Sequence, residues 1–142
     1  MIISDFDGTL LRTDGTISAE TKSAIDGYIA AGGTFGICTG RMTGSILPRA
    51  KELGLKGLVS SYQGSVITDI ESGKLLVDGY IPAENAAEIC RVFEGLNLHT
   101  HVYTLDEFFV NRQDEALEMY ENVCKVKGNV VTDEPLSSFV LK

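Results

Sequence analysis

The chain has 142 residues, of which 44% are hydrophobic and 23% charged, an ordinary composition for a folded protein with a buried core. Its 20 acidic side chains outnumber the 12 basic ones, which gives a formal net charge of −8. That balance argues against nucleic acid as a partner, because affinity for a polyanion comes largely from lysine and arginine. No apolar run reaches the roughly 18 residues that a membrane span needs, so we expect no membrane partner either.

The three cysteines, Cys38, Cys90 and Cys124, are odd in number and widely spaced. They form no C-x-x-C pair, which argues against a zinc site, a redox motif and a disulfide framework. We expect buried free thiols in a reducing compartment. The charged Asp5 interrupts the N-terminus before a signal-peptide pattern can develop, so the cytoplasm is the expected location.

The first sixty residues predict strands that alternate with helices. Ser18 is a suitable N-cap for the first helix, and Gly32 follows the end of that helix. The expected order is a strand over 1–4, a helix beginning after Ser18, a strand over 34–38, a helix over 45–53 and a strand over 57–61. This order implies a parallel sheet with crossover helices, a Rossmann-like α/β core.

The pattern changes after Ser65. Residues 65–81 predict a β-hairpin that turns at 71–73, and Pro82 opens a helix that stops at Gly95. Further along, we expect strands over 98–104 and 108–110, a helix over 114–123 and a last strand over 138–142. The chain is therefore expected to divide into residues 1–81, an incomplete α/β core with its hairpin, and residues 82–142, part of an α+β lid or cap domain.

Residues 5–9, Asp-Phe-Asp-Gly-Thr, stand where the first predicted strand ends, which is the place where open parallel sheets bind ligands. Two carboxylates this close repel each other, and a strand needs neither of them. One ionised carboxylate can attack phosphorus, while its neighbour can donate a proton to the leaving oxygen and later take one from water. Mg²⁺ suits the site because it binds carboxylate and phosphate oxygens, and its charge would offset the repulsion.

The string D-x-D-G-T-L at residues 5–10, followed at a distance by I-C-T-G-R at residues 37–41, resembles the haloacid dehalogenase (HAD) superfamily of phosphatases. The resemblance is closest to the Cof-type sugar-phosphate phosphatases, and it covers the first eighty residues well and the rest loosely. It implies hydrolysis of a phosphomonoester through an aspartyl-phosphate, with Mg²⁺ as cofactor. The implied substrate is a small phosphorylated metabolite.

By this resemblance, Asp5 is the nucleophile and also a magnesium ligand. Asp7 is the acid/base, and its backbone carbonyl is a second metal ligand. The hydroxyl of Thr39 hydrogen-bonds the transferring phosphoryl group. We further expect the substrate phosphate to contact the turn formed by Gly8 and Thr9, and the loop that holds Thr39 and Gly40.

Two residues close to these motifs receive no role. Arg41 belongs to the same loop as Thr39, and we assign it no catalytic function. The family's N-G-A after the third strand is replaced here by Gln63-Gly64-Ser65, and this departure weakens any assignment to Gln63.

The family also places a lysine near its third motif and acidic metal ligands in a later G-D-x-x-N-D-like loop, both normally after the cap. No G-D-x-x-N-D string occurs here, and Lys125 and Lys127 lie in the cap half. We therefore expect a truncated chain, the front part of a longer protein. It should be nearly inactive alone, because losing one donor costs about 10²–10³ in rate. Without a partner strand from beyond the cap, residues 1–5 would form an exposed apolar edge that favours self-association.

Other interpretations remain open. The two aspartates also fit a solvated acidic turn, and less well a calcium loop, whose glycine comes later and follows a helix. His99 and His101 share one face of a predicted strand, which suggests either a metal site or lid residues without a third ligand. For the whole chain, the alternatives are a non-catalytic phosphate-binding or scaffold protein, and a phosphotransferase or mutase of the same superfamily.

Overall fold

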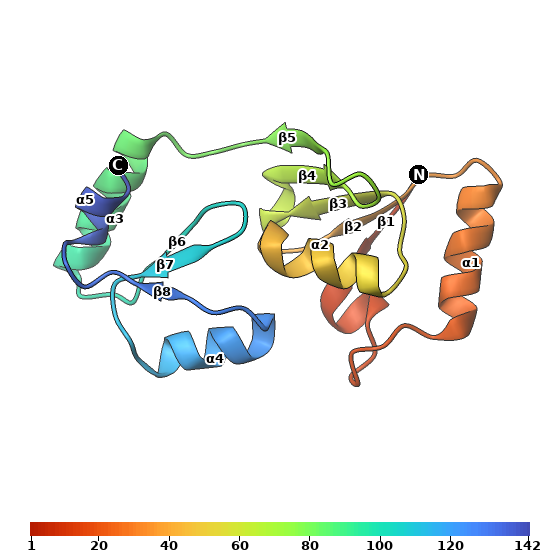
Figure 1. Ribbon diagram of the computed structural model, residues 1–142, viewed down its shortest axis with the longest axis horizontal. Helices are drawn as coiled ribbons and strands as arrows, with labels where there is room; N and C mark the ends of the chain where they lie inside the picture. The colour runs from red at the N-terminus through yellow and green to blue at the C-terminus, as the bar shows by residue number, and fades with distance from the viewer. The chain divides into compact units, whose positions relative to one another are not determined.

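The computed structural model describes all 142 residues, which form two compact units, Met1–Gly79 and Tyr80–Lys142. The first unit holds a five-stranded sheet in the order β1-β2-β3-β4-β5 (Figure 1). Three strands pair in parallel and two continue antiparallel: β1 (Ile2–Asp5), β2 (Phe35–Cys38) and β3 (Leu58–Ser61), then β4 (Val66–Asp69) and β5 (Leu75–Asp78). The predicted α/β core with a parallel sheet is confirmed.

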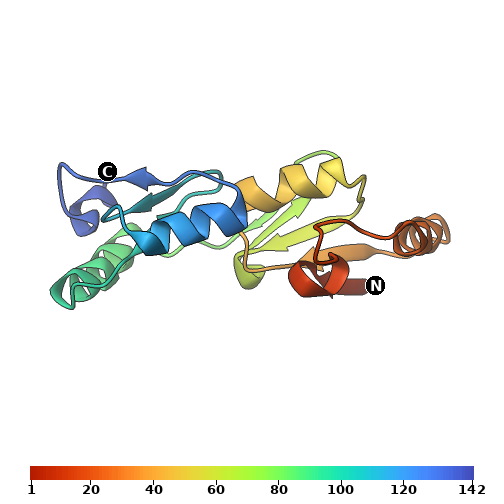
Figure 2. The same cartoon turned by 90° about the horizontal axis from the view of Figure 1, so that it is seen from below.

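Two helices connect the parallel strands. α1 (Ala19–Ala30) begins at Ser18, whose hydroxyl accepts the Thr21 N–H at 3.0 Å, so the predicted N-cap is confirmed. α2 (Thr43–Glu52) runs along one face of the sheet (Figure 2). It begins two residues earlier than expected, at Thr43, directly after the fully buried Met42.

One apolar cluster joins the sheet, both helices and the loop after β1. Its buried members are Phe6, Leu10, Ile25, Phe35, Ile37, Ile46, Ala50, Leu55, Val59 and Ile70. Burying a side chain of this size stabilises a fold by about 1.5–3 kcal/mol. Phe6, the aromatic residue between the two aspartates, is fully buried, so it anchors the loop that carries them.

The second unit contains a three-stranded sheet in the order β6-β7-β8, with helices beside it. Its strands are β6 (His101–Tyr103), β7 (Phe108–Val110) and β8 (Asn129–Val130), and its longer helices are α3 (Ala83–Gly95) and α4 (Glu115–Cys124). The carboxylate of Asp114 caps α4 by accepting the backbone N–H groups of Ala116 and Leu117. This arrangement agrees with the α+β character expected for the cap half.

The last predicted strand, over 138–142, is wrong. Leu136–Phe139 form a short helix, α5, and the two-residue strand β8 was not predicted. Pro135 precedes α5, and its carbonyl accepts the Phe139 N–H at 3.0 Å. The apolar run at the end of the chain favours a strand locally, so the helix must be stabilised by something outside that run.

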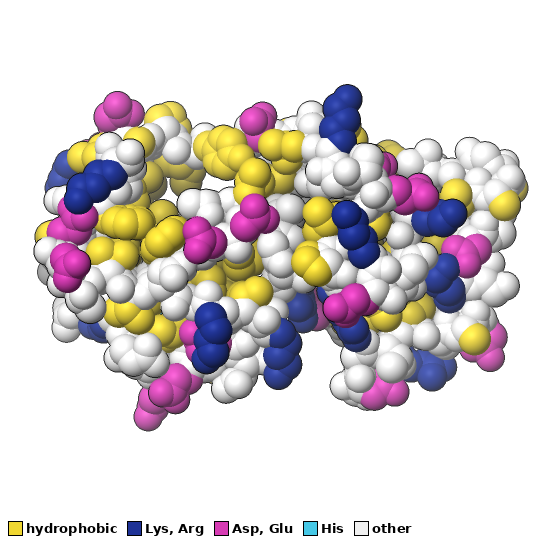
Figure 3. Space-filling view, in the orientation of Figure 1, with side chains coloured by type: hydrophobic (Ala, Val, Ile, Leu, Met, Phe, Trp, Pro, Cys, Tyr) yellow, Lys and Arg dark blue, Asp and Glu magenta, His cyan; other side chains and the backbone are white.

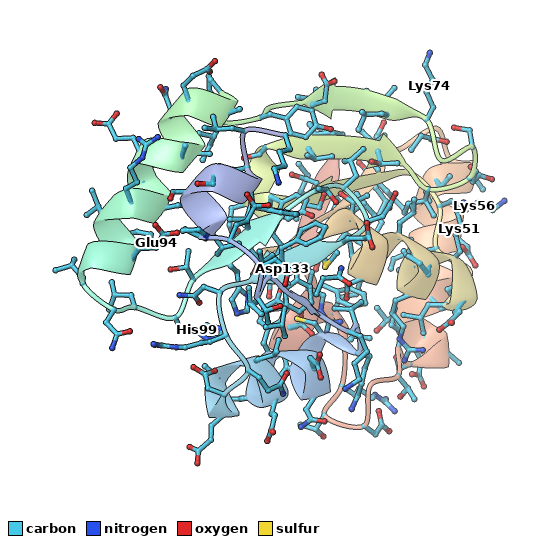
Figure 4. The ribbon with its side chains drawn as sticks, turned by 60° about the vertical axis from the view of Figure 1, so that its left-hand side comes forward. Lys51, Lys56, Lys74, Glu94, His99 and Asp133 are labelled. Atoms are coloured by element: carbon cyan, nitrogen blue, oxygen red, sulfur yellow. The ribbon has the colours of Figure 1, made fainter.

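That stabilisation comes from Glu94 near the end of α3. Its two carboxylate oxygens accept the backbone N–H and the hydroxyl of Ser137, at 2.9 and 2.8 Å. The donor and acceptor residues are 43 positions apart in the sequence. Figure 4 labels Glu94, and α3 and α5 lie side by side (Figures 1 and 4). A distant carboxylate therefore caps α5 in place of a local N-cap side chain.

The surface of the protein carries charges of both signs. On the face drawn in Figure 3, lysine and arginine side chains are dispersed among acidic ones. The longest helix, α3, has 13 residues, and none of the helices has the length and apolar character that crossing a bilayer requires.

A chain of polar side chains runs through the second unit. Nδ1 of His99 lies 3.0 Å from a carboxylate oxygen of Asp114, and the Nε2 atoms of His99 and His101 are 2.7 Å apart. Nδ1 of His101 then lies 2.9 Å from the Tyr103 hydroxyl, which hydrogen-bonds Tyr120. Figure 4 labels His99. The two histidines thus hydrogen-bond each other. No group of three or more His, Cys, Asp or Glu side chains is placed to hold a metal ion.

The contact between the two imidazoles holds a single proton, because the donor nitrogen on one ring needs an acceptor on the other. Burial, reinforced by the neighbouring His99, lowers the pKa of His101 below its ordinary value of 6.5, and the more distant Asp114 opposes this only in part. Burial also raises the pKa of Tyr103, which keeps its hydroxyl neutral. The folded state therefore binds a proton at His101 less readily than the unfolded state does.

We predict that the second unit loses stability as the pH falls below about 6.5, because there the unfolded chain gains a proton that the folded chain does not. The test is the urea midpoint at about pH 7.5 and 5.5, in the wild type and in His101→Phe. Phenylalanine keeps the stacked ring against Phe108, at 5.2 Å between centroids, but cannot titrate. The midpoint of the variant should change less with pH. The same pH dependence in both proteins would contradict the prediction.

Gly57, just before β3, is required by its surroundings. Its φ is +97°, and a Cβ atom there would lie 2.1 Å from the backbone carbonyl oxygen of Phe35. We predict that Gly57→Ala destabilises the protein by at least about 2 kcal/mol, since the clash is with the backbone of a paired strand.

The matched control is Gly27→Ala within α1, where nothing lies within 4 Å of the new Cβ atom. That change should be neutral or stabilising by up to about 1 kcal/mol, because alanine favours a helix more than glycine does. Urea unfolding of both variants measures the difference. Equal effects of the two substitutions would show that Gly57 is not constrained.

Candidate functional site

The carboxyl ends of three parallel strands meet at one edge of the sheet. Asp5, the last residue of β1, pairs in register with Cys38 of β2, so Thr39 follows at the same edge. The backbone N–H of Thr39 donates to the carbonyl of Ser60 in β3 at 2.9 Å, which joins the third strand to this edge. This is the position at which open parallel sheets bind their ligands.

The loop after β1 keeps its aromatic side chain inside and its polar side chains outside. Phe6 is fully buried, whereas Asp5, Asp7 and Thr9 are exposed. Gly8 adopts φ +74° at the kink of this loop, a conformation that glycine accepts without strain. The Thr9 hydroxyl donates to Oδ2 of Asp5 at 3.1 Å. Both predicted catalytic aspartates are therefore exposed to solvent at the carboxyl end of the parallel strands.

Asp7 is engaged by Arg41 from the loop after β2. Nε and Nη2 of Arg41 each donate to one carboxylate oxygen of Asp7, and both distances are 2.8 Å. The sequence analysis missed this contact, although the T-G-R string after a neighbouring parallel strand was a signal for it. The guanidinium balances one of the two negative charges, a role that the sequence analysis had left to a metal.

Thr39 and Gly40 form the turn between β2 and Arg41. Thr39 is 3% exposed, and its hydroxyl accepts the Arg41 N–H at 3.2 Å. Gly40 is exposed, and a Cβ atom there would come 2.8 Å from Nε2 of Gln63. The absence of a side chain at Gly40 thus allows the Gln63 amide to approach the predicted phosphate loop closely.

The turn after β3 has an unusual backbone. Tyr62 and Gln63 both have left-handed φ angles, +51° and +56°, although neither is glycine. The Tyr62 N–H donates to the Arg41 carbonyl at 3.1 Å, and the Gln63 N–H donates to the Thr39 carbonyl at 3.0 Å. These two bonds hold the turn against the T-G-R loop. The sequence analysis gave Gln63 no role, and the structure places its side chain beside Gly40.

The donors at this edge are suitable for Mg²⁺, which needs only one or two protein carboxylates when phosphate and water complete its shell. The Asp5 carboxylate is exposed and accepts one hydrogen bond from Thr9. Both side-chain oxygens of Asp7 accept from Arg41, so its backbone carbonyl is the better candidate ligand, as the resemblance implies. The metal roles of Asp5 and Asp7 stay predictions.

Comparisons with known proteins identify the family and the fold. Residues 2–138 match the family described as haloacid dehalogenase-like hydrolase. A 5-amino-6-(5-phospho-D-ribitylamino)uracil phosphatase of Bacillus subtilis is 31% identical over 116 residues, which are 81% of this chain and 39% of the relative. An X-ray structure from Thermotoga maritima superposes with a TM-score of 0.77 at 27% identity, covering 99% of this chain and 51% of that one.

A sugar phosphatase of HAD subclass IIB has the same fold, with a TM-score of 0.75 at 20% identity over 96% of this chain. The chain covers 39%, 51% and 54% of the lengths of these three relatives, so it spans about half of them or less. The family match, in contrast, runs over nearly the whole chain. The chain therefore belongs to the haloacid dehalogenase-like hydrolases.

Proposed function

We propose that this chain carries the phosphate-accepting part of a Mg²⁺-dependent phosphomonoester hydrolase that acts on a small phosphorylated metabolite. The observation that supports this most directly is the exposure of Asp5 and Asp7 at the strand edge that also holds Thr39. Two similar proteins of Bacillus subtilis are named phosphatases, at 31% and 32% identity. In this proposal, the phosphate group of the substrate binds at the carboxyl ends of the parallel strands.

In the first step of the proposed reaction, a carboxylate oxygen of Asp5 bonds to phosphorus, and the bond between phosphorus and the leaving oxygen breaks. Protonated Asp7 gives its proton to that leaving oxygen. In the second step, a water oxygen attacks phosphorus and its proton passes to Asp7. The bond to Asp5 then breaks and inorganic phosphate leaves.

The surrounding turns hold the phosphoryl oxygens during both steps. In this proposal the Thr39 hydroxyl and the backbone of Gly8, Thr9 and Gly40 donate hydrogen bonds to those oxygens. Mg²⁺, held by the Asp5 carboxylate and the Asp7 carbonyl, neutralises phosphate charge when bound.

We also propose the cytoplasm as the location. Cys38, Cys90 and Cys124 are all free cysteines, and Cys90 and Cys124 are buried. Burial raises the pKa of the Cys90 thiol, which lowers its reactivity. Unpaired thiols of this kind suit a reducing compartment.

The decisive experiment detects phosphate on the protein itself. The 142-residue chain is incubated with p-nitrophenyl phosphate and MgCl₂, quenched in acid, and examined by intact-protein mass spectrometry. We predict a mass increase of one phosphoryl group, removable by hydroxylamine, as expected of an acyl phosphate. Each molecule needs to react only once, so a chain with low turnover still gives a signal.

Asp5→Asn should abolish this labelling, because an amide cannot form the acyl phosphate. The matched control is Asp26→Asn, which changes an exposed carboxylate of α1 that pairs with Lys22. The control should label as the wild type does. Labelling that survives in Asp5→Asn would overturn the proposed nucleophile, and binding of inorganic phosphate without any labelling would favour the non-catalytic alternative.

Finally, we propose that copies of this chain associate through β1. This strand stands at one end of the sheet and pairs only with β2. Its residues Ile2 and Ile3 are 48% and 58% exposed, and the preceding Met1 is 75% exposed. An apolar edge strand with unpaired backbone groups is a template for pairing with another chain.

We predict that light scattering coupled to size exclusion shows a mass that rises with protein concentration. Ile3→Lys should return the chain to a monomer, because an edge lysine opposes strand pairing. Ile81→Lys is the matched control, since Ile81 is a similarly exposed isoleucine, at 63%, outside β1. A monomeric wild type at high concentration, or equal effects of both substitutions, would count against the β1 edge.

A further inference from the structure

The pair formed by Asp7 and Arg41 is asymmetric. The two residues are 34 positions apart and meet because β1 and β2 end together. The Asp7 side chain is 50% exposed, whereas the Arg41 side chain is only 16% exposed. The arginine is therefore the fixed partner, and the aspartate is the partner that reaches the solvent where a substrate would arrive.

Arg41 is fixed by several contacts of its own. Its guanidinium carbon lies 5.7 Å from the centre of the buried Phe6 ring, in a cation–π arrangement. Its Nη1 lies 3.4 Å from the hydroxyl of Ser45 in the first turn of α2. Its backbone is held by Thr39 and Tyr62. The planar guanidinium thus presents two parallel donors in one orientation, which a lysine at this position could not do.

This geometry fixes the orientation of the Asp7 carboxylate. Both of its oxygens accept hydrogen bonds from the planar Arg41 guanidinium, so the carboxylate is held in one plane. The second step of the proposed reaction requires this group in a defined position, because there Asp7 takes a proton from the attacking water. With a substrate whose leaving oxygen needs no proton, the second step is the one that depends on where Asp7 lies.

We propose that Arg41 is a positioning residue that holds Asp7 as the base for hydrolysis of the aspartyl-phosphate. The role rests on the proposed function, since it presupposes phosphate on Asp5. In that step the water oxygen bonds to phosphorus, the water proton moves to Asp7, and the bond between phosphorus and Asp5 breaks. Arg41 touches neither the phosphate nor the water in this role and acts only through Asp7.

The experiment separates formation of the phosphoenzyme from its breakdown. p-Nitrophenolate leaves without a proton, so labelling by p-nitrophenyl phosphate does not depend on Asp7. We expect Arg41→Met to label at a rate within about threefold of the wild type, and to lose its label about tenfold to a hundredfold more slowly after the donor is removed. Arg41→Lys should lie between the two proteins.

Two further variants distinguish positioning from a general structural effect. Arg49→Met removes an arginine that lies within α2 and pairs with Glu52. It should leave the rates of phosphoenzyme formation and breakdown unchanged. Asp7→Asn should slow loss of the label, and adding Arg41→Met to Asp7→Asn should slow it no further, because Arg41 acts through Asp7. A further loss in the double variant, or an equal slowing of formation and breakdown in Arg41→Met, would overturn the role of Arg41.

An NMR measurement tests the pair without any reaction. The Nε–H signal of Arg41, identified by its absence in Arg41→Lys, should exchange with water slowly in the wild type and at least about tenfold faster in Asp7→Ala. Fast exchange in the wild type would overturn the inference. Absence of phosphate transfer in the wild type would overturn the proposed function itself, whereas wild-type transfer with an unchanged Arg41→Met overturns only the role of Arg41.

Discussion

The site depends on the parallel pairing of β1 with β2, in which Asp5 lies opposite Cys38. A slip of one residue would shift β2, whose residues Phe35 and Ile37 pack in the apolar cluster, relative to β1. The same slip would move the T-G-R loop away from Asp7. Packing of the core and assembly of the site therefore require the same strand register. Burial of β2 determines which polar residues meet at the carboxyl ends of the strands.

Buried apolar residues anchor the two loops that carry the candidate site residues. Phe6 lies within the loop after β1 and Met42 directly follows the T-G-R loop, and both are fully buried. Neither loop is long enough to move its polar side chains far from such an anchor. A site supported in this way keeps its donors and acceptors oriented before a ligand arrives, which lowers the cost of binding and reaction.

Features that depend on neighbouring residues were predictable from the sequence. The Ser18 cap, the alternation of strands and helices, and the acidic loop at the end of β1 all follow from local patterns. Features that depend on distant residues were not. α5 is capped by Glu94 from α3, and Asp7 is paired with an arginine from another strand end. No local pattern encodes either contact, although a parallel sheet brings the loops after its strands to one edge.

The turn after β3 has a strained backbone that depends on the T-G-R loop beside it. Left-handed backbone at Tyr62 and Gln63 costs on the order of 1–3 kcal/mol per residue, so the turn persists only while its surroundings impose it. The carbonyls of Thr39 and Arg41 impose it through two hydrogen bonds. Displacement of the T-G-R loop would break both bonds and allow the turn after β3 to relax to a less strained backbone. We therefore expect the two loops to move together.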